Sequence, residues 1–153
     1  MKVPYVQSPF RSRTVITWKD IDWLHSFVRV PILLKGILNP DDADEAAKNG
    51  VSGIIVSNHG ARELDTVPAT IDALPHIADK VAGRMPILMD GGIRRGTDVL
   101  KALALGAKAV LIGRPYCYGL GAAGSEGVSR VVKILRNEFE IAMALTGRPT
   151  RQH

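Results

Sequence analysis

Four short apolar runs, separated by segments with helical spacing, constrain the fold of this chain more than any other feature. The runs are Pro31–Leu34, Gly53–Val56, Pro86–Met89 and Ala109–Ile112. Their length and composition predict β-strands, and strands that alternate with helices predict a parallel sheet. The runs contain no polar residue, which is typical of strands in a sheet covered on both faces or closed into a barrel.

The segments around these runs carry the start and stop signals of helices. Thr17 can cap a helix, because Asp20 follows three positions later and apolar residues recur at helical spacing. Asn39-Pro40 predicts a second helix start, and Asn49-Gly50 predicts its end. Further helices are predicted from Pro68 to Gly83, from Thr97 to Leu105 and from Val128 to Leu145, the last after a glycine-rich stretch, Gly119–Gly127. Residues 1–13 read as an irregular lead-in.

Two architectures fit this alternation, a doubly wound sheet and a β/α barrel. A complete barrel needs eight strand–helix units in about 250 residues. The chain has 153 residues, and four such units are visible in it. We therefore expect one α/β domain over residues 1–153 that contains half of a barrel, or a small open sheet.

Each apolar run is followed by an ionisable side chain for which an apolar strand has no structural need. Lys35 follows the first run, His59 the second, Asp90 the third and Arg114 the fourth. The carboxyl ends of parallel strands lie on one face of the sheet, so we expect these four side chains to converge. Such a convergence is the plan of an active site.

The first two strand ends carry groups suited to acid–base chemistry on an anionic substrate. His59, in the segment Ser57-Asn58-His59-Gly60, can act as a general base because histidine titrates near neutral pH. Arg62 lies three residues on, and its guanidinium can bind a carboxylate through two parallel hydrogen bonds. Lys35 can hold a further anionic group, with a lysine that merely extends into water as the alternative.

The last two strand ends predict a phosphate site. Asp90-Gly91-Gly92-Ile93-Arg94 is a glycine-rich turn ahead of a helix, and Gly113-Arg114 follows the next run. Glycine lets backbone amides approach an anion, and a helix N-terminus favours negative charge. Barrel enzymes often bind phosphate with the loops after their last two strands, which would place four further units before residue 1. Two unrelated tight turns are the alternative.

Composition narrows the kind of ligand. The formal charge is +5, but no long run of like charges and no interleaved aromatic residues indicate nucleic acid. Gly119–Gly124 has the spelling of a dinucleotide loop but does not end a strand, so we predict no nicotinamide site. We expect no membrane segment, no metal site and a cytoplasmic location. The single Cys117 fits a reducing compartment and is predicted to be a small core residue.

These residues resemble the C-terminal half of the FMN-dependent α-hydroxy-acid oxidases and dehydrogenases, the family of glycolate oxidase, lactate oxidase and flavocytochrome b2. The resemblance covers about residues 14–147 and rests on two long runs, SGIIVSNHGARELD (52–65) and DGGIRRGTDVLKALALGA (90–107). Shorter matches are Thr17–Asp20, Ile32–Gly36, Gly113–Pro115 and Asn137–Glu140. The resemblance implies a (β/α)8 barrel of the TIM type, of which this chain would form strands five to eight.

The resemblance also implies a role for each matching position. His59 would be the active-site base and Arg62 would bind the substrate carboxylate. FMN would be held by Lys35 and Ser57 near the ring and, around the phosphate-bearing arm, by Asp90, Gly91, Gly92, Ile93, Arg94, Gly113 and Arg114. The implied reaction is oxidation of a small (S)-2-hydroxy acid to a 2-oxo acid, with electrons passing to FMN and then to oxygen or another acceptor.

Three hypotheses about function remain at this point. The chain belongs to a 2-hydroxy-acid oxidase or dehydrogenase, or it is a half-barrel that binds FMN or phosphate and pairs its open strand edges in a homo-oligomer. The third hypothesis is another barrel enzyme that binds phosphate, such as an FMN-dependent isomerase or an inosine-monophosphate-type dehydrogenase. His59 and Arg62 occurring together argues against the third.

Overall fold

The computed structural model describes residues 16–148, which divide after Val30 into two units. The first unit contributes helix α1 (Trp18–Phe27), which begins where the sequence predicts. The backbone amide and the hydroxyl of Thr17 donate to Asp20 Oδ2 at 2.8 and 2.9 Å. In return, the backbone amide of Asp20 donates to the carbonyl of Thr17 at 2.9 Å, and this reciprocal pairing explains why the helix starts at Trp18. The predicted lead-in, residues 1–13, lies outside the described residues.

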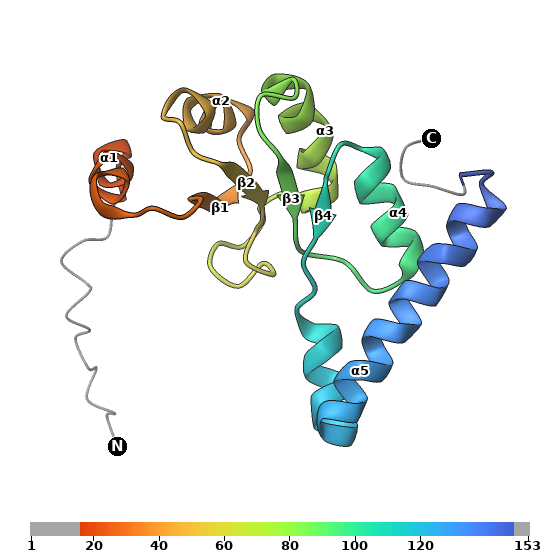
Figure 1. Ribbon diagram of the computed structural model, residues 1–153. Helices are drawn as coiled ribbons and strands as arrows, with labels where there is room; N and C mark the ends of the chain where they lie inside the picture. Colours follow the sequence, from red (N-terminus) through yellow and green to blue (C-terminus); the bar gives the residue numbers. More distant parts are fainter. Residues whose placement is uncertain (1–15, 149–153) are drawn as a thin grey trace, which may run out of the picture. The chain divides into compact units, whose positions relative to one another are not determined.

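The second unit is a four-stranded parallel sheet in which a helix follows every strand (Figure 1). The strands hydrogen-bond in the order β1-β2-β3-β4, which is also their order along the chain. A doubly wound sheet reverses its strand order at a switch point, whereas a β/α barrel does not. The observed order is therefore that of half a barrel. The elements are β1 (Leu33–Ile37), α2 (Pro40–Lys48), β2 (Gly53–Val56), α3 (Thr70–Val81), β3 (Ile87–Met89), α4 (Gly96–Ala104), β4 (Ala109–Val110) and α5 (Arg114–Leu145).

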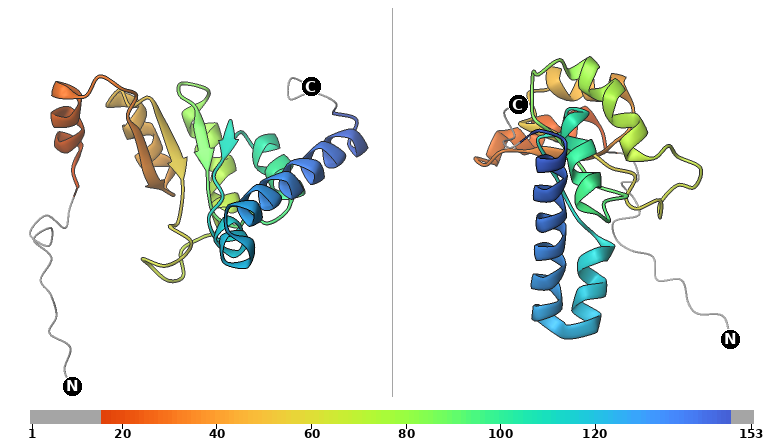
Figure 2. Two further views of the ribbon diagram at one scale, coloured as in Figure 1. Left: turned by 60° about the horizontal axis from the view of Figure 1, so that its bottom comes forward. Right: turned by 90° about the vertical axis from the view of Figure 1, so that its right-hand side faces the viewer.

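Helices α2, α3 and α4 cover one face of this sheet (Figure 2). Ile54 and Val56 of β2 pair in register with Ile87 and Met89 of β3, and all four are at most 4 % exposed. Ile55 alternates with them and is only half-buried. One face of the sheet thus forms a closed core with the helices, and the other face is less covered by the described residues.

The first and last strands differ from their predicted bounds. Strand β1 does not end at Lys35 but continues to Ile37, and its pairing with β2 shifts register between these residues. Gly36, at the shift, has φ +99°, a conformation that glycine adopts readily. Lys35 therefore lies inside the strand, just before a bulge. Strand β4 ends at Val110, two residues earlier than expected.

The glycine-rich stretch is helical, which corrects the prediction that the last helix begins near Val128. Helix α5 starts at Arg114 and is interrupted only at Ala123 and Gly124, where the chain turns back on itself (Figure 1). A Cβ on Gly119 would lie 2.6 Å from the carbonyl oxygen of Gly127, so glycine allows the two arms to touch. Within the described range, no helix is both long and apolar enough for a membrane crossing.

An ion-pair cluster fastens α2 to the end of α3. Asp44 Oδ2 lies 2.9 Å from Lys48 Nζ, and Asp44 Oδ1 lies 2.6 Å from Arg84 Nη2. Hydrogen bonds from Lys48 and Arg84 lower the pKa of Asp44 to about 2, because they stabilise its charged form. Arg84 also donates to the carbonyl groups of Lys80 and Val81, and so closes the C-terminus of α3.

Candidate functional site

The carboxyl ends of the strands surround a cavity of about 510 Å³. Every residue predicted for the site except Ser57 lines this cavity, namely Lys35, His59, Arg62, Asp90, Gly91, Gly92, Ile93, Arg94, Gly113 and Arg114. The convergence predicted from the four strand ends is therefore present in the folded chain. The roles of these residues stay predictions at this point.

Lys35, Ser57 and Asp90 form a hydrogen-bonded cluster at the base of the cavity. Lys35 Nζ donates to Ser57 Oγ at 2.9 Å and lies 3.0 Å from Asp90 Oδ2. Ser57 is 1 % exposed, and its Oγ also accepts the backbone amide of His59 at 3.1 Å. Ser57 thus holds both the ammonium group of Lys35 and the backbone of His59 in place, although it does not itself line the cavity.

Asp90 carries an unusual buried atom. Its Oδ2 is paired with Lys35, while Oδ1 is buried and has no hydrogen-bond partner among the described residues. A buried carboxylate oxygen without a donor is costly, so such an atom indicates a place where a donor group from outside these residues is received.

His59 and Arg62 face each other at 3.3 Å, between His59 Nε2 and Arg62 Nη2. A guanidinium can only donate, so Nε2 accepts and a neutral ring carries its proton on Nδ1. On that side, Glu63 Oε1 lies 3.6 Å from Nδ1. His59 has φ +56°, in the left-handed region that non-glycine residues rarely adopt. This turn exposes the imidazole and places its basic lone pair beside a cation suited to a carboxylate.

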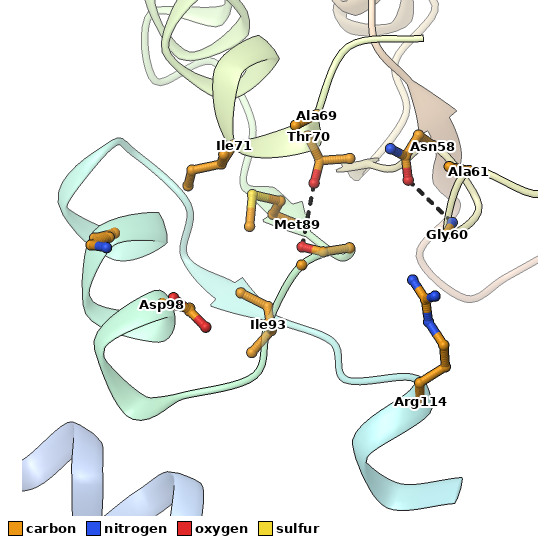
Figure 3. Close-up of a pocket in the computed structure, with 13 residues that line it drawn as sticks. Asn58, Gly60, Ala61, Ala69, Thr70, Ile71, Met89, Ile93, Asp98 and Arg114 are labelled. Carbon is orange, nitrogen blue, oxygen red and sulfur yellow. Dashed lines mark hydrogen bonds between the residues drawn. The ribbon is translucent and has the colours of Figure 1, made fainter. Parts of the chain in front are cut away.

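The loop between β3 and α4, residues 90–95, is held by a buried threonine. Thr70, 3 % exposed, donates its hydroxyl to the carbonyl of Asp90 at 2.6 Å, and in Figure 3 it is directed at this loop. Gly91 and Gly92 have φ +86° and +76°. Around Gly92 no atom lies within 4 Å of an added Cβ, so its backbone borders open space. The loop can therefore present amides to an anion.

The three arginines that follow strand ends point to different places. Arg114, the first residue of α5, reaches toward the turn at Gly60 and Ala61 (Figure 3). Arg94 lines the cavity, and no side-chain partner for it occurs within residues 16–148. Arg95 turns away and pairs with Glu138 of α5, with 2.9 Å between Nη2 and Oε1. Only two of the three arginines are therefore available to a ligand in the cavity.

Glu138 is one of the residues that sequence reasoning missed. Its Oε2 accepts the backbone amide of Gly96 at 2.9 Å, and the hydrogen bonds from Arg95 and Gly96 lower the pKa of Glu138. The hydrogen bond with Glu138 in turn raises the pKa of Arg95. The run Asn137–Glu140 belongs to the family resemblance, but nothing in its local pattern shows that the carboxylate reaches a loop some 40 positions earlier in the chain.

Three other residues at the site were not predicted. Thr70 falls inside the helix predicted from Pro68 to Gly83 and has no predicted site role. Asn58, whose Oδ1 accepts the amide of Gly60 at 3.1 Å, lies in the predicted loop after the second strand and likewise has no predicted site role. Cys117 is exposed and lines the cavity with Tyr116, so its prediction as a core residue is wrong. A hydrogen bond with Cys117 raises the pKa of Tyr116. Cys117 lies near the start of α5, in a segment for which the sequence predicted no helix.

A pattern for the FMN-dependent dehydrogenase family matches residues 4–153 of the chain. The chain is 61% identical over 135 residues to the peroxisomal (S)-2-hydroxyacid oxidase GLO4 of Arabidopsis thaliana, a match over 88% of this chain and 37% of that protein. It is 59% identical over 132 residues to 2-hydroxyacid oxidase 1 of Homo sapiens, over 86% of this chain and 36% of that protein. The chain thus spans little more than a third of the length of these curated relatives.

Solved structures of mandelate oxidase resemble this chain in fold. A mandelate oxidase in complex with benzoyl-formic acid superimposes with a TM-score of 0.87 at 44% identity, over 90% of this chain and 41% of that one. A mandelate oxidase variant with a monooxide FMN adduct also gives 0.87 and 44%, over 90% of this chain and 44% of that one. The predicted class, part of a TIM barrel with parallel strands and alternating helices, is confirmed.

Proposed function

The chain belongs to the FMN-dependent dehydrogenase family, and on that premise we propose that it forms the FMN-binding and proton-abstracting part of an (S)-2-hydroxy-acid oxidase or dehydrogenase. The observation that carries the proposal is the meeting of Lys35, His59, Arg62 and Arg114 around one cavity. Lys35, Arg62 and Arg114 are cations that can donate to an anion, and the imidazole of His59 can accept a proton. Substrate and cofactor are both anionic, as this arrangement requires.

The cavity offers the groups that FMN needs. Gly92 and Gly113 have nothing within 4 Å of an added Cβ, so both leave room for a phosphate against the backbone. Arg94 and Arg114 would neutralise that phosphate, and Lys35 would hold the electron-rich edge of the ring. The unpaired Asp90 Oδ1 would accept a donor from the bound group. FMN, when bound, supplies the two-electron acceptor for the reaction.

The remaining chemistry falls to His59 and Arg62. A substrate carboxylate would take the guanidinium of Arg62 in a bidentate pair, and this would release the hydrogen bond that now occupies His59 Nε2. The free lone pair of Nε2 then accepts the proton lost by the 2-hydroxy acid. The imidazolium that results would be stabilised by Glu63, which lies 3.6 Å from Nδ1. Arg62 therefore binds the acid and also unmasks the base.

The positive charge of Lys35 at this site is paired with the carboxylate of Asp90. Asp90 Oδ2, 3.0 Å away, compensates the ammonium, and Ser57 fixes its direction. A lysine held in this way can offset negative charge that develops on a bound group, without the cost of reorganising water during the reaction.

A second candidate function is a half-barrel that binds FMN or phosphate and associates with another copy. The observation that favours it is the sheet itself, because β1 and β4 are its two edges in the described part of the chain. Leu33 of β1 is 40 % exposed, and unpaired edges of this kind invite strand pairing. A homo-oligomer would satisfy these edges.

The compartment belongs to the proposal as well. The sequence led us to expect the cytoplasm, whereas the names of two matched relatives place those proteins in peroxisomes. We propose that the chain resides in the cytoplasm or in peroxisomes. Its single cysteine, Cys117, cannot form a disulfide within the chain, so the sequence carries no sign of an oxidising compartment.

Binding and turnover test the proposal separately. The purified chain should bind FMN and become yellow, and it should oxidise glycolate or lactate with oxygen or a dye as acceptor. His59→Ala should remove oxidation and keep FMN, whereas His76→Ala, on the exposed side of α3, should change neither. Unchanged turnover in His59→Ala would refute its role as the base. FMN binding without turnover in the parent would favour the half-barrel.

The phosphate role has its own test. Arg114→Ala should weaken FMN retention, while Arg130→Ala, exposed on the same helix, should not. Equal flavin occupancy in Arg114→Ala and the parent would contradict the assignment.

A further inference from the structure

We propose that Glu138 is a positioning residue for the phosphate-binding loop, acting from α5 on the junction between the loop (residues 90–95) and α4. The inference rests on the proposed FMN site and adds a residue that lies outside the cavity. The two adjacent arginines, Arg94 and Arg95, have the same local sequence pattern, and only the family resemblance singles out Arg94.

Two carboxylates hold the junction. Asp98 Oδ2 accepts the backbone amides of Arg94 and Arg95 at 2.9 and 2.8 Å, as a cap within α4 itself. Glu138 reaches in from α5 and accepts the amide of Gly96 at 2.9 Å. The first amides of a helix have no partner inside the helix, so these bonds decide how the loop enters α4.

Glu138 also removes one arginine from the site. Both of its oxygens accept from Arg95 Nε, at 2.9 and 3.0 Å, and Oε1 lies 2.9 Å from Nη2. With Arg95 fixed on α5, the neighbouring Arg94 is the one that lines the cavity. Because side chains at successive positions leave the backbone in different directions, anchoring one determines where the other goes. Glu138 thus selects which arginine faces the phosphate.

The backbone contact at the same point keeps the anchor close. Gly96 is buried, and a Cβ there would overlap the backbone of Glu138 and Phe139. Helices α4 and α5 therefore touch at this residue without an intervening side chain. A short and rigid contact of this kind transmits the position of α5 to the loop.

Hydrogen exchange on the full chain without FMN tests the positioning. In Glu138→Gln and Glu138→Ala, the amides of Arg94–Asp98 should exchange at least about tenfold faster, which corresponds to about 1.4 kcal/mol of lost protection. Glu140→Gln is the matched control, because Glu140 is paired with Arg136 at 2.7 Å two residues further along the same helix. Unchanged exchange in both Glu138 variants would overturn the inference, whatever happens with FMN.

A comparison of FMN with riboflavin tests the link to phosphate. Glu138→Gln should weaken FMN binding about tenfold and leave riboflavin binding within about twofold, since riboflavin lacks the phosphate. Equal losses for both ligands would indicate a general structural role and overturn the inference. Tighter FMN binding, from a released Arg95, would also overturn it. A parent chain that binds neither flavin refutes the proposed function, and the exchange experiment still decides the role of Glu138 in positioning the loop.

Discussion

Replacing Gly96 with alanine tests the contact between α4 and α5 on which the shape of the β3–α4 loop depends. A methyl group on Gly96 would lie 2.5 Å from Glu138 Cβ and closer still to the backbone of Glu138 and Phe139. Carbon atoms in ordinary contact are about 3.5–4.0 Å apart, so the helices must separate by about 1 Å. The hydrogen bond from Gly96 to Glu138, now 2.9 Å, would then exceed the usual limit.

The cost follows from these changes. Overpacking destabilises by about 1–3 kcal/mol, a lost hydrogen bond to a charged group adds about 1.5–3 kcal/mol, and better helix propensity returns up to about 1 kcal/mol. We expect Gly96→Ala to lower the free energy of unfolding by about 2–4 kcal/mol, from the combination of these effects. With a urea dependence of about 2 kcal/mol per molar, the midpoint of unfolding should fall by about 1–2 M.

Urea unfolding followed by circular dichroism measures this shift, and Gly121→Ala is the matched control. Gly121 is also helical, but nothing lies within 4 Å of an added Cβ there, so alanine should be neutral or stabilising by up to about 1 kcal/mol. If Gly96→Ala unfolds at the same urea concentration as Gly121→Ala, the close approach of the two helices is not a feature of the folded protein in solution.

Three further predictions concern stability and its dependence on pH. Asp44→Asn should destabilise the chain above about pH 4 and should have almost no effect by about pH 2. The reason is that the pKa of Asp44 in the folded chain, about 2, lies below its ordinary value of 3.8, so the stabilisation is present above pH 3.8 and disappears as the pH falls through 2. Urea midpoints measured across this pH range record the change. An effect of Asp44→Asn that grows on acidification would contradict this sign. Gly92→Ala should lower the free energy of unfolding by about 1–2 kcal/mol, because alanine is strained at the positive φ of this residue. Gly91→Ala should lower it by at least about 1 kcal/mol more, because the added Cβ would lie 2.9 Å from Thr70 Oγ1. Equal melting temperatures for the two variants would count against this contact. Leu74 of α3 is fully buried, so Leu74→Ala should lower the free energy of unfolding by about 2–5 kcal/mol in the same urea assay. A decrease of less than about 1 kcal/mol would mean that the core between α3 and the sheet is not closed.

The sequence predicted which residues belong to the candidate site better than it predicted how they contact one another. Lys35, His59, Asp90 and Arg114 were expected together because parallel strands end on one face, and all four line the same cavity. Their connections were not predictable. The bond from Lys35 to Ser57 joins β1 to the residue that follows β2, and its 2.9 Å length depends on the register of the two strands, which shifts just after Lys35.

The glycine-rich stretch shows why local patterns can mislead. Glycine has low helix propensity, so Gly119 and Gly127 suggested a loop. They are helical because the two arms of α5 approach so closely that a Cβ on either would collide with the other. A sequence shows that side chains are absent at these positions, but it does not show whether flexibility or close packing requires their absence.

The amino-acid sequence was sufficient to predict the alternation of strands and helices, the helix caps at Thr17 and Asn39, and the family to which the motifs belong. These properties depend on residues a few positions apart, whose interactions local spacing controls. The family resemblance already implied Arg94, but the contact by which Glu138 holds Arg95 on α5, while Arg94 lines the cavity, is visible only in the folded chain. That contact depends on the packing of α5 against α4, which brings together residues 43 positions apart that no local spacing relates.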